Sequence, residues 1–122
     1  MNRILVVEDE PDLVVTYDRL LRRQGYRVVT AASRREGLDA IESAPPALVI
    51  VDLRLPDGDG LDIIRAAHAQ DPKLPVIVVT AFASRTARDA ALASGASAFL
   101  PKPFPASALL RLVEDELKRS TH

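Results

Sequence analysis

The chain has 122 residues, of which 48% are hydrophobic and none is cysteine. This length suits one domain and excludes a second sizeable one, so we expect a single domain over residues 1–122. The net charge of -1 gives no overall positive field to attract nucleic acid, and the missing thiols exclude disulfides and thiolate metal sites.

The first half of the chain alternates between apolar runs and amphipathic segments. Residues 4–7 are continuously aliphatic, which predicts a strand buried on both faces. Helical periodicity follows over 11–24, and the shorter apolar pair 28–29 indicates a strand near the edge of the sheet. A capping box at 33–36 opens a second helix, which Pro45 and Pro46 end.

The second half repeats this alternation. Strands are expected at 47–51, 76–79 and 98–100, and helices at 61–71, 85–94 and 109–117. Such strict alternation leaves room only for crossover helices between parallel strands. The sequence therefore predicts a doubly wound α/β domain with five parallel strands and five helices.

Polar residues follow the strands where each strand ends. Glu8 and Asp9 come after the first strand, Asp52 after the third, Thr80 after the fourth and Lys102 after the fifth. The carboxyl ends of parallel strands form the ligand edge of such a sheet, so these side chains should converge. Crowded carboxylates repel one another unless a cation neutralises them. Oxygen donors favour Mg²⁺, and no histidine or cysteine nearby favours zinc.

These residues together describe an aspartate that attacks phosphorus. Asp52 directly follows the central strand and is the best nucleophile, whereas Glu8 and Asp9 are better suited to hold the cation. Lys102 and Thr80 can bind oxygens of the transferring group. The product would be an aspartyl phosphate.

Four motifs identify a family that the chain resembles. They are 4–11 (ILVVEDEP), 52–60 (DLRLPDGDG), 79–81 (VTA) and 99–104 (FLPKPF), each at the end of a predicted strand. In this order they resemble the receiver domain of bacterial two-component response regulators over essentially the whole chain. The resemblance implies a flavodoxin-like strand order, 2-1-3-4-5.

The resemblance also implies roles for the residues of the acidic edge. Asp52 would be the phosphoacceptor and Lys102 the phosphoryl-binding lysine. Mg²⁺ would bind Asp9 and Asp52 directly, Glu8 through water, and the backbone carbonyl of Arg54.

A second group of residues would transmit and tune the signal. Thr80 and Phe99 look like the switch pair, in which Phe99 turns inward once the Thr80 hydroxyl moves to the phosphate. Arg54 and Phe82 occupy positions that tune the lifetime of the acyl phosphate in the family. The peptide bond between Lys102 and Pro103 is expected to be cis.

The implied function is a signalling switch rather than a metabolic enzyme. The phosphoryl donor would be a histidine kinase or a histidine phosphotransfer protein, and slow autodephosphorylation would end the signal. Phosphorylation would change the face built by residues 85–94, 98–100 and 109–117, through which a homodimer is also expected.

Three alternatives compete with this interpretation. A haloacid-dehalogenase-like phosphatase wants a second aspartate where Arg54 stands, and a flavodoxin-like cofactor carrier would find Glu8, Asp9 and Glu10 repelling its phosphate. An interaction module that is never phosphorylated would be favoured by lost site residues, and none appears lost. We assign Asp57 and Asp59 to turn formation rather than to the site.

The N-terminal apolar run is too short for a signal peptide or a membrane span. We therefore expect a cytoplasmic protein with no membrane partner. We also expect no direct binding of nucleic acid by this chain.

Overall fold

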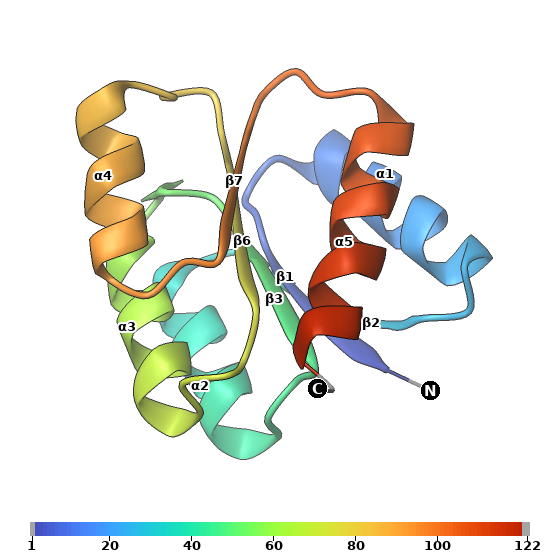
Figure 1. The fold of residues 1–122 in the computed structure, drawn as a ribbon, viewed down its shortest axis with the longest axis horizontal. Coiled ribbons are helices and arrows are strands. Elements are labelled where there is room, and N and C mark those ends of the chain that lie inside the picture. Colours follow the sequence, from blue (N-terminus) through green and yellow to red (C-terminus); the bar gives the residue numbers. More distant parts are fainter. Residues whose placement is uncertain (1, 121–122) are drawn as a thin grey trace.

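The structure, a computed structural model, describes residues 2–120 and contains a five-stranded parallel sheet between two layers of helices (Figure 1). The strands of this sheet are β1 (Arg3–Val7), β2 (Arg27–Ala31), β3 (Leu48–Val51), β6 (Val76–Thr80) and β7 (Ala98–Pro101). Their order is β2-β1-β3-β6-β7, and every neighbouring pair is parallel. With β6 and β7 as the fourth and fifth strands of the sheet, this is the predicted order 2-1-3-4-5, so the predicted fold is confirmed.

The five predicted helices are all present. They are α1 (Pro11–Arg23), α2 (Arg34–Ser43), α3 (Leu61–Gln70), α4 (Arg85–Ala93) and α5 (Ala106–Ser120). Helices α1 and α5 cover one face of the sheet, and α2, α3 and α4 cover the other (Figure 1). The last helix begins at Ala106, three residues before its predicted start.

The sheet is buried on both faces, which explains its uninterrupted apolar strands. Along β1, Ile4 and Val6 belong to the apolar core beneath α1 and α5. Leu5 and Val7 belong to the core on the opposite face, with residues of α2 and α3. Because successive side chains of a strand point to opposite faces, each strand contributes to both cores.

A two-stranded antiparallel hairpin follows β3, formed by β4 (Arg54–Leu55) and β5 (Gly58–Asp59). Its connecting residue Asp57 accepts hydrogen bonds from the backbone amides of Arg34 at 2.6 Å and Arg35 at 2.9 Å. These amides lie in the first turn of α2 and have no partner within the helix, so Asp57 caps a helix distant in sequence. The sequence predicted only a turn here.

Gly60 closes the loop that begins at Asp52. A Cβ atom at Gly60 would collide with the backbone carbonyl oxygen of Asp52. Its amide donates to the carbonyl of Leu53 at 2.8 Å. Only glycine therefore lets the start of α3 approach the residue at the end of β3 so closely.

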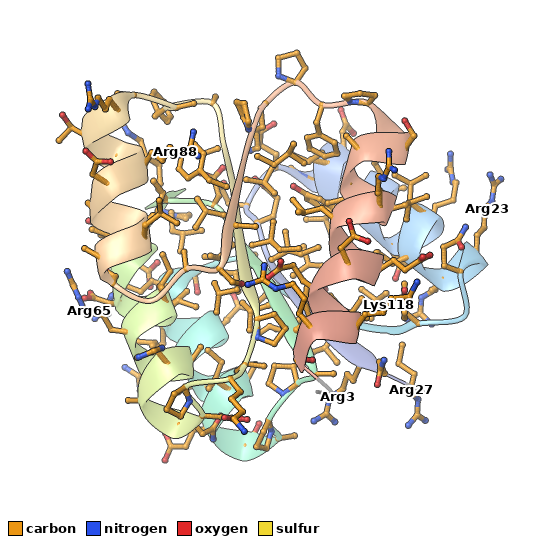
Figure 2. The ribbon with its side chains drawn as sticks, viewed as in Figure 1. Arg3, Arg23, Arg27, Arg65, Arg88 and Lys118 are labelled. Carbon is orange, nitrogen blue, oxygen red and sulfur yellow. The ribbon has the colours of Figure 1, made fainter. Side chains whose placement is uncertain are left out.

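The basic side chains are distributed around the outside of the molecule. The six labelled in Figure 2 come from six different elements: Arg3, Arg23, Arg27, Arg65, Arg88 and Lys118. Within residues 2–120, every helix is too short or too polar to cross a lipid bilayer.

Candidate functional site

Backbone hydrogen bonds extend the sheet beyond its strands and bring the candidate residues to one edge. The amide of Asp52 donates to the carbonyl of Val7 at 3.1 Å, and the amide of Lys102 donates to the carbonyl of Thr80 at 2.9 Å. The amide of Glu8 bonds in the same way to the last carbonyl of β2. The sheet thus fixes the positions from which the side chains of Glu8, Asp52 and Lys102 meet.

Lys102 lies among three carboxylates. Its Nζ is 2.7 Å from Oδ2 of Asp52, 2.9 Å from Oε1 of Glu8 and 3.5 Å from Oε1 of Glu10. Glu8 and Asp52 are buried, and the Lys102 side chain is only 10% exposed. The peptide bond from Lys102 to Pro103 is cis, as expected.

Burial and charge oppose each other in this cluster. Burial raises the pKa of Glu8 above its usual range, although the hydrogen bond and charge of Lys102 partly offset this effect. Burial by itself would lower the pKa of Lys102, but hydrogen bonds from Lys102 to Asp52 and Glu8 outweigh burial and raise it. Lys102 therefore stays charged and neutralises acids that would otherwise repel each other.

Three carboxylates form the donor set for a cation. Oxygen atoms of Glu8, Glu10 and Asp52 lie within 4.8 Å of one another. An all-oxygen, acidic set fits Mg²⁺ and offers none of the softer ligands that zinc prefers. The residues present therefore fit the ion that the sequence predicted.

Glu10 belongs to this set, although the sequence analysis did not assign it a ligand role. Asp9 is exposed and lies outside the set. Glu10 has an extended backbone, and its amide donates to Oε2 of Glu8 at 3.2 Å, which keeps the two residues together. The signal was available in the alternation of the acidic run.

Arg54 lies beside the site through its backbone. Its amide donates to Oδ1 of Asp52 at 3.2 Å. Its guanidinium instead lies over the ring of Phe82, an exposed residue at the end of β6. The two residues predicted to tune the acyl phosphate are therefore in contact with each other.

Thr80 and Phe99 lie on neighbouring strands and toward the same face. Thr80 is fully buried, and its hydroxyl accepts a hydrogen bond from the amide of Phe82 at 3.2 Å. Phe99 is opposite Val78 in the register, and both pack in the core beneath α2, α3 and α4. Thr80 follows two residues after Val78, which directs its side chain to that face as well.

Phe99 also borders an open pocket of about 450 Å³ beside α4. Its side chain is half-buried, and the pocket is otherwise lined by Ala83, Ser84, Arg85, Arg88, Asp89 and Pro101. The aromatic ring thus lies between the core and the surface of α4.

A second open pocket, of about 530 Å³, lies beside Lys102. Its walls come from the beginning of α1 and from the segment before α5, and they include Glu10, Leu13, Thr16, Ala81, Lys102 and Phe104. The pocket gives the lysine end of the site access to solvent.

Residues 4–114 match the sequence model of the family described as response regulator receiver domain. The response regulator MprA of Mycolicibacterium vanbaalenii is 40% identical over 119 residues, which cover 98% of this chain and 52% of that protein. The transcriptional regulatory protein GlrR of Escherichia coli is 37% identical over 117 residues, or 96% of this chain and 26% of that protein. The chain thus spans about half or less of these relatives' length.

Solved receiver domains have the same fold. A CheY-like response regulator receiver domain protein from Methanospirillum hungatei superposes with a TM-score of 0.96 at 32% identity, covering 99% of this chain and 97% of that one. The non-phosphorylated receiver domain of HemR from Leptospira biflexa gives a TM-score of 0.89 at 34% identity, covering 96% and 94%.

Proposed function

The chain belongs to the family of response regulator receiver domains, which are signalling domains switched by phosphorylation, and on this premise we propose that Asp52 is its phosphoacceptor. The observation that supports this role most directly is the contact between Asp52 and Lys102 at 2.7 Å inside a buried acidic cluster. The family membership leaves no reason to prefer the phosphatase or the cofactor carrier.

In the proposed step, a carboxylate oxygen of Asp52 attacks the phosphorus of a phosphohistidine. The bond from phosphorus to oxygen forms, the bond from phosphorus to nitrogen breaks, and the imidazole of the donor leaves. Lys102 would bind the oxygens of the phosphoryl group, because its ammonium already contacts the attacking carboxylate. Thr80 offers its hydroxyl to the same group.

Mg²⁺ would supply positive charge to the phosphoryl oxygens. We propose that Asp52 and the acidic residues after β1 hold it, together with the backbone carbonyl of Arg54. Of those acidic residues, Glu8 and Glu10 contribute to the carboxylate group that the structure brings together, and Asp9 remains the ligand that the family resemblance implies. Lys102 occupies the same carboxylates, so the lysine and the cation must share them.

The output would arise from Thr80 and Phe99. Movement of the Thr80 hydroxyl toward the phosphate frees space on its face of the sheet, and the half-buried Phe99 turns into it. The outside of α4, β7 and α5 changes as a result, and a second copy of the chain or another output partner would bind there.

The phosphoryl donor would be a histidine kinase or a histidine phosphotransfer protein. The donor histidine must reach Asp52 from solvent, and the open pocket beside Lys102, the residue in contact with Asp52, leaves space next to the site. The two longer relatives are response regulators or transcriptional regulators. Loss of the phosphoryl group by slow hydrolysis would return the domain to its resting state.

Intact mass after incubation with acetyl phosphate tests the proposal. Wild type should gain one phosphoryl group only when Mg²⁺ is present. Asp52→Asn should gain none, whereas Asp57→Asn, which alters a carboxylate in the same loop, should gain one. A folded wild type that gains nothing would contradict the proposal and favour an interaction module that works without phosphorylation.

A further inference from the structure

Tyr17 lies on α1 beneath the site and is completely buried. Its ring stacks on that of Phe104, with the centroids 5.8 Å apart and the planes inclined by 22°. Phe104 follows closely after Lys102, so this stack joins α1 to the segment that carries the lysine. Packing with Phe104 and the core accounts for the ring.

Packing does not account for the hydroxyl. Within residues 2–120, the Tyr17 hydroxyl oxygen is the only buried side-chain nitrogen or oxygen without a hydrogen-bond partner. Burying an unpaired hydroxyl costs free energy, and a phenylalanine would form the same stack without that cost. The position therefore carries a polar group that the resting fold does not use.

Glu8 follows Ile4 and Val6 at the same two-residue spacing, and its amide continues the ladder of β1, so its side chain is directed to the face of the sheet on which Tyr17 packs. Burial raises the pKa of Tyr17 far above its usual value, and the charges of Glu8, Asp52 and Glu10 raise it further, with Glu8 having the largest effect of the three. The phenol therefore keeps its proton and can donate. Ionised carboxylates only accept hydrogen bonds, so an unused donor and a buried acceptor, Glu8, belong to the same side of the sheet.

Glu8 is the acceptor whose partners must change. Its Oε1 now contacts Lys102 at 2.9 Å, and its Oε2 accepts from the amide of Glu10 at 3.2 Å. Under the proposed function Lys102 turns to the phosphoryl group on Asp52. Glu8 then loses its charged donor while its carboxylate remains buried, and a buried carboxylate needs donors.

We propose that Tyr17 is a positioning residue whose hydroxyl donates a hydrogen bond to Glu8 when Lys102 engages the phosphoryl group. The inference rests on the proposed function and adds a residue to it. The stack on Phe104 already orders the ring, so forming the hydrogen bond to Glu8 costs little further side-chain entropy. Glu8 is thereby held as an acceptor beside the cation.

Tyr17→Phe removes the hydroxyl and keeps the stack. The matched control is Tyr26→Phe, the same change at the half-buried tyrosine before β2. Beryllium fluoride, which mimics a phosphoryl group on a carboxylate, is titrated calorimetrically in the presence of Mg²⁺. We expect its affinity to fall about tenfold in Tyr17→Phe, the loss of one hydrogen bond to a charged group, and to stay unchanged in Tyr26→Phe.

Thermal unfolding without ligand separates this role from a structural one. Tyr17→Phe should melt at or above the wild-type temperature, because the resting protein gives the hydroxyl no partner. Equal beryllium fluoride affinities for wild type and Tyr17→Phe would overturn the inference, and so would a clear loss of stability in the ligand-free variant. A wild type that binds no beryllium fluoride and gains no phosphoryl group would instead overturn the proposed function, and this inference with it.

Discussion

The guanidinium of Arg54 lies over the ring of Phe82, with Cζ 3.6 Å from the ring centroid. Arg54 comes two residues after Asp52, and Phe82 comes two residues after Thr80. Their contact therefore spans the two loops that flank the carboxylate. A cation–π contact of this kind is worth about 0.5–1 kcal/mol at an exposed site.

Replacing Phe82 should shorten the life of the acyl phosphate. In Phe82→Ala the guanidinium of Arg54 loses the ring over which it lies, and water gains access to the phosphoryl group. We expect hydrolysis to accelerate about two- to fivefold, the rate equivalent of the lost contact. Decay of the phosphorylated protein by intact mass measures this. Leu92→Ala, at a comparably exposed position on α4, should decay like wild type; no acceleration in Phe82→Ala would remove the shielding role.

Replacing Lys102 should change how stability depends on pH. Lys102→Met leaves Glu8 buried without its cation, so the pKa of Glu8 rises further above its ordinary value of about 4.5. A carboxyl group with a raised pKa stabilises the fold when protonated, and this stability is lost as pH rises through the folded-state pKa. The free energy of unfolding in urea should therefore fall more steeply as pH rises above about 4.5 in the variant than in wild type.

The control for this profile is Lys73→Met, which removes an exposed lysine. Its stability should follow the wild-type curve across the same range. Parallel profiles for Lys102→Met and wild type would show that Lys102 does not neutralise the buried acids.

Replacing Glu10 should weaken Mg²⁺ binding. Its carboxylate belongs to the close group with Glu8 and Asp52 although its side chain is 64% exposed. Glu10→Gln removes one negative charge in a well-solvated position, which corresponds to about 1 kcal/mol and a fivefold loss of affinity. Calorimetric titration with Mg²⁺ measures it. Asp12→Asn, an exposed acid in the first turn of α1, should bind as wild type does; an equal loss in both variants would indicate a general charge effect.

Replacing Gly60 should destabilise the fold. In Gly60→Ala the added methyl group collides with the backbone of Asp52, which cannot move without shifting the end of β3. We expect a loss of about 1–3 kcal/mol in urea unfolding. In Gly37→Ala the methyl group meets side chains instead, the tip of Ile63 and the methyl groups of Val7, and these yield more easily than backbone. A Gly37→Ala variant that loses more stability than Gly60→Ala would contradict this reasoning.

The fold was predictable because the sequence patterns that indicate its strands and helices extend over several residues. Continuous apolar runs such as 48–51 and 76–79 predict buried strands over several residues, and helical periodicity between them decides the topology. The hairpin of β4 and β5 has two residues in each strand, which is too short to show any periodicity. Its existence depends on contacts with α2 that the local sequence does not contain.

The edge of the sheet was predictable, and the details of its side chains were less so. The strand ends indicated that Glu8, Asp52 and Lys102 would meet, and the structure brings them together. The place of Glu10 depends on the hydrogen bond from its amide to the carboxylate of Glu8. For Tyr17, helical spacing predicts a ring on the core face of α1 but does not reveal the surroundings of its hydroxyl.

Asp57 connects the loop after Asp52 to the first turn of α2, and Gly60 packs against the backbone of Asp52. These contacts fix the loop after Asp52 against α2 and α3, so the acidic site is held rigidly on that side. On the other side lie β7, an edge strand with half-buried side chains, and the exposed residues 81–86. If Asp52 is phosphorylated as proposed, we expect the domain to relax toward β7 and residues 81–86, because the cap at Asp57 and the close packing at Gly60 oppose movement on the side of α2 and α3.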